Sequence, residues 1–329
     1  MKNIFITGGA GYIGSHCVLS LIKHGYAPII LDNFSNSSRI TIKKLEKITK
    51  KKIIFYDVDL KNKKKLKTIF ERHNCYTVIH CAGFKAVEES TKKPLMYLNN
   101  NIGSTLGLIE CMQEKNKFNL IFSSSAVVYD EKNVPPFDEK DQIGESKNPY
   151  ATTKIIIEKI LMELVKFDKR WKIGILRYFN PIGNHSSGLI SDRPLGKPNN
   201  LLPYIVKVAK KKLPYLKVFG NDYPTQDGTC LRDYIHVMDL AEGHVALIKK
   251  KLKKTINIYN LGTGNGLSVL EIIQKFEKEN NIKIPFKFSK RREGDIAISF
   301  CNPKKALKEL NWKPKYSINQ AMKDIKSAF

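Results

Sequence analysis

The sequence predicts an α/β fold, in which a doubly wound parallel sheet is followed by a smaller C-terminal α/β lobe. Short apolar runs alternate with segments of helical spacing through residues 1–180. A glycine-rich turn joins the first apolar run to the first helical segment. From residue 181 onward Pro, Asn and Gly become frequent and the helical segments are shorter. Strands that alternate with helices imply right-handed crossovers, and therefore a parallel sheet with helices on both faces.

The apolar pattern places each element of the first part in turn. Strands are expected over 2–7, 27–32, 53–58, 76–82, 119–124 and 172–178. Helices are expected between them, over 13–24, 39–49, 62–73, 96–116 and 150–166. Further along, residues 236–250 have helical spacing and residues 256–262 form an apolar strand, so we expect the chain to return to the first domain over 234–262. Ser268 and Glu271 form a capping box that opens a last clear helix through Lys278.

The turn after the first strand has the sequence TGGAGYIGSH (7–16), with Gly8, Gly11 and Gly14 three residues apart. Glycine allows a backbone conformation that is closed to other residues, and it lets another atom approach closely. The free N–H groups at the start of the following helix attract anions. This stretch therefore predicts a phosphate-binding turn, with an ordinary strand-to-helix turn as the alternative.

The second strand ends in Asp32, 18 residues past Gly14. A dinucleotide site of the Rossmann type needs a carboxylate at about this distance for the adenosine ribose hydroxyls. A turn aspartate is the simpler alternative, but the whole strand–glycine–helix–strand–acid unit favours a dinucleotide. An acid here would repel a 2′-phosphate, so we expect NAD rather than NADP, although the nearby Arg39 leaves NADP open.

Composition limits the class of protein. The chain has 329 residues and 42% hydrophobic residues, which is ordinary for a globular protein with one large or two modest domains. No apolar run approaches the roughly 20 residues of a membrane span, and we expect no signal peptide. The six cysteines contain no CxxC pair, which argues against a metal site or a disulfide framework and is typical of a reducing cytoplasm.

The net charge of +26 raises the question of nucleic-acid binding. Only eight of the 57 basic residues are arginine, and the lysines lie in runs without interleaved aromatic residues. Arginine is the better bidentate reader of bases and phosphates. We therefore expect a lysine-rich solvated surface and a weak, salt-sensitive attraction to polyanions, with no specific nucleic-acid partner.

Polar residues gather where the predicted strands end. In a parallel sheet the ligand lies beyond the carboxyl ends of the strands. The segments expected at this edge are the glycine turn, Asp32, Asp59, CAGFK (81–85), SSS (123–125) and RYFNP (177–181).

Tyr150 and Lys154 stand four residues apart on the helix that Pro149 opens, and therefore share one face. A lysine ammonium and a cationic nicotinamide would both favour the phenolate, so we expect the pKa of Tyr150 to fall. A tyrosine of this kind acts as a general acid and base, with Ser125 hydrogen-bonded to the same substrate oxygen. An exposed Tyr and Lys on a surface helix is the alternative.

Taken together, these motifs resemble the extended short-chain dehydrogenase/reductases, and among them the UDP-glucose 4-epimerases. The resemblance runs from Lys2 to about Tyr316. It rests on TGGAGYIGSH, DNFSNS (32–37), HCAGFKAVEES (80–90), FSSSAVVY (122–129), YATTK (150–154), RYFNPIGNH (177–185), PNNLLPYI (198–205), FGNDYPTQDGTCLRDYIHVMDLAEGHV (219–245) and RREGD (291–295).

The resemblance implies a role for many individual residues. Ser125, Tyr150 and Lys154 would be catalytic. The cofactor NAD would be held by these three and by Gly8, Gly11, Tyr12, Ile13, Gly14, Asp32, Asn33, Phe34, Ser35, Asn36, Ser37, Asp59, Leu60, Cys81, Ala82, Gly83, Phe84, Lys85, Asn100 and Phe179. The UDP-sugar would be held by Ser125, Tyr150, Asn180, Asn200, Leu201, Phe219, Arg232, Arg292, Asp295 and Ser299. No metal is expected.

The implied reaction is reversible C4 epimerisation of UDP-glucose and UDP-galactose through a 4-keto sugar, with NAD kept bound. Residues 1–180 would form the NAD-binding Rossmann domain and residues 181–329 the UDP-sugar lobe. The resemblance also implies a cytoplasmic homodimer, joined through helices near 96–116 and 150–166. The chain ends at Phe329, earlier than many relatives, so we expect a shortened last helix.

Three departures from the family pattern bear on function. Asp130 replaces a common glycine and Val127 a common threonine, which puts the rate of reaction in question. Ser299 stands where some relatives carry a bulky tyrosine, and a small residue there goes with room for an N-acetyl group, so UDP-GlcNAc is a further candidate substrate.

Two other functions remain as alternatives. An NDP-sugar 4,6-dehydratase would need an Asp-Glu pair where Ala126 and Val127 stand. The second alternative is a non-catalytic NAD-binding regulator. The presence of the catalytic residues and of both UDP arginines argues against it.

Overall fold

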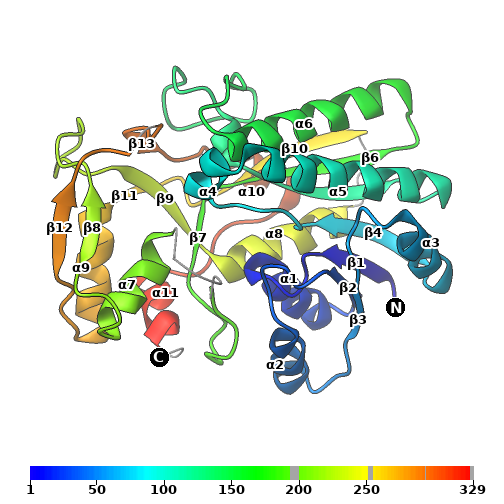
Figure 1. Cartoon of the computed structure of the whole chain (residues 1–329), viewed down its shortest axis with the longest axis horizontal. Helices are drawn as coiled ribbons and strands as arrows, with labels where there is room; N and C mark the ends of the chain where they lie inside the picture. Colours follow the sequence, from blue (N-terminus) through cyan, green and yellow to red (C-terminus); the bar gives the residue numbers. More distant parts are fainter. Residues whose placement is uncertain (193–199, 251–254, 293, 327–329) are drawn as a thin grey trace.

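The computed structural model describes residues 1–192, 200–250, 255–292 and 294–326. Its main element is a seven-stranded sheet in which all neighbouring strands run parallel, in the order β10–β6–β5–β4–β1–β2–β3 (Figure 1). The strands are β1 (Asn3–Thr7), β2 (Ala27–Asp32), β3 (Ile54–Asp57), β4 (Cys75–His80), β5 (Asn119–Ser125), β6 (Lys172–Tyr178) and β10 (Ile256–Leu261).

The strand order reverses at β1. Strands β2 and β3 lie on one side of β1, and β4, β5, β6 and β10 on the other. A sheet of this kind opens a crevice beyond the carboxyl ends of the strands at the reversal point, where a dinucleotide is bound. The glycine turn, Cys81 and Ser125 follow or end the three neighbouring strands β1, β4 and β5, so the topology brings them to this crevice.

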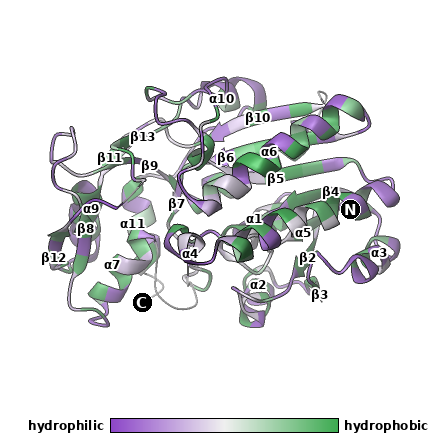
Figure 2. Ribbon diagram, turned by 45° about the horizontal axis from the view of Figure 1, so that its top comes forward, coloured by the Kyte–Doolittle hydropathy of each residue, from purple (hydrophilic) through white to green (hydrophobic). Residues whose placement is uncertain are grey.

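Helices cover both faces of the sheet because its inner strands bury side chains on both sides, whereas the edge strand β3 is largely exposed. In β1, Ile4 and Ile6 pack into one core and Phe5 into the other. The first core is closed by α1 (Tyr12–Lys23), α2 (Arg39–Thr49) and α8 (Val237–Lys250). The second core is closed by α3 (Lys63–Arg72), α5 (Pro94–Glu114) and α6 (Pro149–Phe167). Figure 2 shows β5 and β6 largely in the colour of hydrophobic residues.

The second lobe has its own core of Ile, Leu, Val, Phe and Met side chains. Strand β9 (Leu231–His236) pairs with β7 (Asn180–Ile182), β11 (Gly266–Ser268) and β13 (Ile298–Ser299), and β8 (Leu216–Phe219) pairs with β12 (Phe286–Ser289). The helices of this part are α7 (Leu201–Ala209), α9 (Val269–Asn280) and α11 (Ile318–Lys326), whereas α10 (Lys304–Leu310) packs against the first core of the main sheet. Elements α7, α9, α11, β8 and β12 lie together at the end of the molecule away from α3 (Figure 1).

The expected elements of the first part are confirmed to within a few residues. Helix α5 begins at Pro94, two residues before the predicted start, because a proline fits the first turn. The capping box of Ser268 and Glu271 is present at the start of α9. Helix α11 ends at Lys326, and the last three residues lie outside the described part of the chain, so the shortened last helix stays a prediction.

Several short elements were not predicted. They include α4 (Val87–Lys92), the 3-10 turn η1 (Ala126–Val128), α10, α11 and most strands of the second lobe. Two to four residues are too few to show a hydrophobic period, and these strands exist only through their partners. Within the described residues, no helix combines the length and the apolar character needed to cross a membrane.

Candidate active site

The glycine turn between β1 and α1 is closed so tightly that side chains would not fit. Gly8 has a φ of +66°, and a Cβ atom placed there would lie 2.9 Å from the backbone of Ala82. A Cβ atom on Gly14 would lie 2.2 Å from the carbonyl oxygen of Gly8. Gly11 caps α1 without any side-chain hydrogen bond to the first turn. The amide groups that open α1 are therefore available to an anion, as a bound pyrophosphate requires.

The carboxylate of Asp32 is fixed beside this turn. It accepts hydrogen bonds from the backbone nitrogens of Ala10 and Phe34, both at 2.9 Å, and from the Ser37 hydroxyl at 2.8 Å. Its side chain is 7% exposed. Arg39, the residue for which NADP was kept as an alternative cofactor, is paired with Asp57 at the surface. Two carboxylates at the ends of β2 and β3 disfavour a 2′-phosphate, which supports NAD.

The segment after β4 is held by Asn101, a residue that the sequence analysis missed. Its amide oxygen accepts from the backbone nitrogen of Phe84 at 2.8 Å, and its amide nitrogen donates to the Phe84 carbonyl and to the Thr153 hydroxyl, both at 3.0 Å. The predicted Asn100 donates to the same amide oxygen at 3.1 Å. Asn101 thus ties the cofactor-side loop to α6, next to Lys154. The sequence did contain a signal for Asn101, because it is a polar residue on the buried face of the long helix α5.

Ser125 and Tyr150 come together at the crevice. Ser125 is the last residue of β5, and Tyr150 lies in the first turn of α6, whose start is fixed by Pro149 and by the Asn148 side chain, which accepts from Ala151 N at 2.9 Å. Burial raises the pKa of the Tyr150 phenol, and a hydrogen bond with Ser125 opposes this rise.

The ammonium of Lys154 donates to the Ser123 carbonyl at 2.6 Å, and burial lowers its pKa to about 8. The predicted fall in the pKa of Tyr150 is therefore wrong for the ligand-free protein. The lysine points to the backbone of β5, and burial of the phenol outweighs the Ser125 hydrogen bond. Of the two causes that we expected, the cationic nicotinamide is the one that remains to lower this pKa.

A charged cluster in the second lobe brings together four residues from three separate segments of the sequence. Arg292 forms a forked pair with Asp295, through Nε at 2.8 Å and Nη2 at 3.2 Å. Its guanidinium lies 5.0 Å from the centre of the Phe219 ring. Arg232 reaches the same carboxylate at 3.9 Å. Two guanidinium groups, a carboxylate and an aromatic ring suit a diphosphate, a ribose diol and a base.

Ser299 lies beside Arg232 of this cluster, and the other residues predicted for the UDP-sugar lie on β7 and at the start of α7. Ser299 is buried on β13, where its Cα is paired with that of Arg232 on β9. Asn180 is exposed at the start of β7, and Asn200, just before Leu201 at the start of α7, donates to Asp192 at 3.3 Å.

The other residues predicted for the cofactor are spread around the strand ends. Tyr12 donates to the Gly183 carbonyl at 2.6 Å, and Lys85 pairs with Asp192 at 3.6 Å, so both connect the first lobe to the second. Phe179 is buried against Phe137. Exposed or half-buried around the loops after β2, β3 and β4 are Asn33, Phe34, Ser35, Asn36, Ser37, Asp59, Ala82 and Gly83, whereas Leu60 is buried.

A buried ion pair supports the strand that carries Ser125. Arg177 on β6 and Glu158 on α6 pair through three contacts, the shortest 2.8 Å, and Ser124 donates to the same carboxylate. Charges buried to this degree need full pairing. The pair locks α6 against β5 and β6, and therefore fixes the position of Tyr150 relative to Ser125. The sequence analysis did not identify it.

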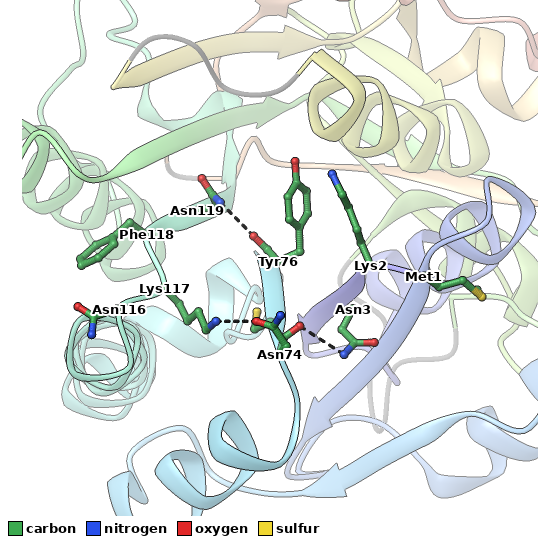
Figure 3. A pocket seen from close by; sticks show the side chains of 10 residues that line it. Met1, Lys2, Asn3, Asn74, Tyr76, Asn116, Lys117, Phe118 and Asn119 are labelled. Carbon is green, nitrogen blue, oxygen red and sulfur yellow. Dashed lines mark hydrogen bonds between the residues drawn. The ribbon is translucent and has the colours of Figure 1, made fainter.

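A surface pocket of about 460 Å³ lies at the opposite edge of the sheet, among the first residues of β1, β4 and β5 (Figure 3). Its polar groups satisfy one another: Lys117 donates to Asn74 at 2.7 Å and Asn119 to the Tyr76 carbonyl at 3.0 Å. Ligands of parallel sheets bind at the carboxyl ends of the strands, so this pocket is not the cofactor site.

Comparisons with known proteins cover nearly the whole chain. The family model described as GDP-mannose 4,6 dehydratase matches residues 5–325. UDP-glucose 4-epimerase 2 of Arabidopsis thaliana is 47% identical over 98% of this chain and 94% of its own. The structure of UDP-glucose 4-epimerase from Bifidobacterium longum in complex with NAD⁺ and UDP is 44% identical, with a TM-score of 0.97, over 99% of this chain and 98% of its own. The Stenotrophomonas maltophila enzyme, solved with NAD and formylated UDP-arabinopyranose, is 40% identical with the same TM-score, over 100% and 98%.

Proposed function

This chain belongs to the UDP-glucose 4-epimerases, within the wider family described as GDP-mannose 4,6 dehydratase, and we propose that it interconverts UDP-glucose and UDP-galactose with NAD as its bound cofactor. The observation that carries this proposal is the meeting of Ser125 and Tyr150 at the carboxyl edge of the sheet, between the uncapped start of α1 and the arginine cluster of the second lobe. The protein is therefore an isomerase that acts on a nucleotide sugar.

The residues of the crevice fit NAD. The glycine turn leaves no room for a Cβ atom, the first amides of α1 have no side-chain cap, and the Asp32 carboxylate is fixed for a ribose. When bound, NAD supplies an acceptor for the hydride of the sugar C4 and returns it to either face of the ring. We assign residues 1–180, with the return over 234–262, to this cofactor and residues 181–329 to the UDP-sugar.

Tyr150 is the proton carrier of the proposed reaction. As the phenolate, which a nearby cationic nicotinamide would favour, it takes the proton of the sugar 4-hydroxyl as the 4-keto sugar forms, and it gives this proton back when the hydroxyl is restored. The Ser125 hydroxyl donates a hydrogen bond to the same sugar oxygen and limits where it lies. Lys154, held by the Ser123 carbonyl, places one positive charge beneath this site. Because the reaction returns the cofactor to its starting state, no second substrate is needed.

The UDP part of the substrate supplies the binding energy. Arg232 and Arg292 would hold the diphosphate, Asp295 the ribose diol and Phe219 the uracil face, with Asn180, Asn200 and Leu201 at the edges. Binding through the unreactive part leaves the hexose free to turn between its two faces. This division explains why the cluster lies in the second lobe and the proton carrier in the first.

The test is incubation of the purified protein with UDP-galactose and no added cofactor. We expect UDP-glucose to accumulate until the two sugars reach a fixed ratio, and the same ratio from UDP-glucose. Conversion that starts only after NAD is added would contradict tight retention of the cofactor. Formation of a 4-keto-6-deoxy sugar would instead favour the dehydratase, although Ala126 and Val127 give it no acid pair.

Three finer features are part of the same proposal. UDP-GlcNAc is a further substrate, because the Ser299 side chain is small and lies beside Arg232. The protein forms a homodimer through α5 and α6, as the exposed Leu95, Met96 and Leu106 of α5 support. The protein works in the cytoplasm, as its free cysteines support.

A further inference from the structure

The fold brings together two cysteines and a histidine that are far apart in the sequence. Cys17 lies on α1, Cys81 follows β4, and His244 lies on α8. One ligand atom from each lies within 4.8 Å of the others. Cys17 and His244 are fully buried and Cys81 is half-buried, so the cluster sits beneath the loop expected to flank the cofactor.

One distance within the cluster already matches that of a metal centre. The Sγ atom of Cys17 lies 3.6 Å from Nδ1 of His244. Zn²⁺ binds sulfur at about 2.3 Å and nitrogen at about 2.0–2.1 Å in a tetrahedron, which places these two ligand atoms roughly 3.6 Å apart. The Ser123 hydroxyl lies 3.0 Å from the Cys81 sulfur, close enough to supply an oxygen ligand.

The surroundings of the cluster suit a divalent cation. Two thiolates and a neutral imidazole balance a charge of +2, so the buried site would be neutral as a whole. Both cysteine thiols release their protons when they bind such an ion as thiolates.

The outer partners of His244 are also in place. Its Nε2 atom lies against the Tyr178 hydroxyl, which donates to Ser123 at 2.7 Å. An Nε2–H group that donates to Tyr178 would leave Nδ1 free to bind a metal, as ligand histidines require. In the metal-free structure the Nδ1–H group donates to the Leu240 carbonyl at 2.9 Å, so metal binding would replace this hydrogen bond and move the proton to Nε2.

We propose that Cys17, Cys81 and His244 form a binding site for a thiophilic divalent cation such as Zn²⁺ or Cd²⁺, with the Ser123 hydroxyl or a water molecule as the fourth ligand. Cys17 and His244 lie outside the groups that carry the epimerase reaction, whereas Cys81 belongs to the loop expected to flank the cofactor. The metal proposal stands whether or not that function is correct. A bound ion would draw the Cys81 loop toward α1 and α8. It would thereby link metal content to the position of a loop at the cofactor crevice.

The test uses the full-length purified protein, Cd²⁺ alone, and the ultraviolet absorption of the cadmium–thiolate bond. We expect one Cd²⁺ per chain, with an absorption of the size given by two thiolates. The variants Cys17→Ser and Cys81→Ser should each bind at least about 100-fold more weakly, since loss of an outer partner alone costs about 10- to 100-fold. Cys111→Ser, which replaces a buried cysteine on α5, is the matched control and should bind as the wild type does.

Each possible result of this experiment either supports the metal site or overturns it. Cd²⁺ uptake that persists in both Cys17→Ser and Cys81→Ser would overturn the proposal, as would absence of uptake by the wild type after overnight incubation. His244→Gln provides a third variant with both thiols intact, in which we expect weaker binding and a shifted absorption. Circular dichroism of each variant shows whether it is folded, and any one folded variant of the three is enough for the comparison.

Discussion

The ammonium nitrogen of Lys154 lies 2.6 Å from the carbonyl oxygen of Ser123, which anchors the lysine to β5 two residues before Ser125. The side chain is 9% exposed, and burial lowers its pKa to about 8. The lysine that the sequence placed beside the phenol is therefore held by the backbone beneath it. It therefore fixes the backbone of β5 close to Ser125, and its burial makes the stability of the fold depend on pH.

Replacing Tyr150 with phenylalanine removes only the proton carrier. We expect kcat for epimerisation to fall by about 10²- to 10⁴-fold, the range for loss of a general acid and base, while UDP binding is retained. Steady-state turnover of UDP-galactose and calorimetry with UDP measure the two effects. Tyr316→Phe, at a tyrosine stacked on His236 4.3 Å away, is the control and should keep full activity. Unchanged epimerisation in Tyr150→Phe would refute the mechanism.

Lys154→Met should change the dependence of stability on pH. The folded-state pKa of Lys154 is lowered from 10.5 to about 8, so below pH 8 the folded protein carries a buried charge that costs about 3 kcal/mol. Between pH 8 and 10.5 the folded protein has lost this proton and the unfolded chain has kept it, so the contribution of this group to stability rises with pH.

The measurement is the free energy of unfolding of wild type and Lys154→Met at pH 7 and pH 10. The difference between the two proteins should move in favour of the wild type by about 2–3 kcal/mol on going to pH 10. Taking this difference removes the titrations that both proteins share. Equal differences at the two pH values would show that Lys154 has an ordinary pKa in the folded protein.

Arg292→Lys should weaken UDP binding by about 10- to 100-fold, because lysine cannot form the forked contacts of a guanidinium with a phosphate or with Asp295. We expect KM for UDP-galactose to rise with a smaller change in kcat. The adjacent Arg291 offers a matched control, since it pairs with the exposed Asp222 instead. Arg291→Lys should leave UDP binding within about twofold, and equal loss in both variants would argue against a specific role for Arg292.

Gly14→Ala tests the cofactor turn. The new Cβ atom would lie 2.2 Å from the Gly8 carbonyl oxygen, a backbone atom that cannot move without opening the turn. We expect loss of copurified NAD, read from the nucleotide released on denaturation, and a loss of about 1–3 kcal/mol in stability. Gly103→Ala on α5 is the control, because its nearest neighbour is the exposed side chain of Asn99 at 3.3 Å. That variant should retain NAD.

Ser299→Tyr tests the range of sugars. The side chain of Ser299 is 6% exposed and its Cα is paired with that of Arg232, so a tyrosine would fill space beside the UDP-sugar cluster. We expect UDP-GlcNAc turnover to be lost while UDP-glucose turnover persists, with Ser299→Ala as a control that keeps both. A wild-type protein that converts UDP-glucose but never UDP-GlcNAc would refute the N-acetyl proposal outright.

The sequence alone determined the parallel sheet, the glycine turn, Asp32 and the place of Tyr150 and Lys154 on one face of a helix. Each depends on local pattern: an apolar period, a turn that only glycine can make, or a helical spacing of four residues. The direction of the chain then placed their ends at one edge of the sheet. The short strands of the second lobe were missed because they are too short to show a local pattern. Strand β13, for example, has two residues and exists through its pairing with β9.

The tertiary structure alone decided what surrounds these residues. It showed that Lys154 is held by the Ser123 carbonyl, that burial raises the pKa of Tyr150, and that Asn101 fixes the loop beside the cofactor crevice. It also joined Cys17, Cys81 and His244, where the absence of a CxxC pair had argued against any metal site. Burial and the distance between residues remote in the sequence arise only when helices pack on the sheet, and a linear pattern does not contain either quantity.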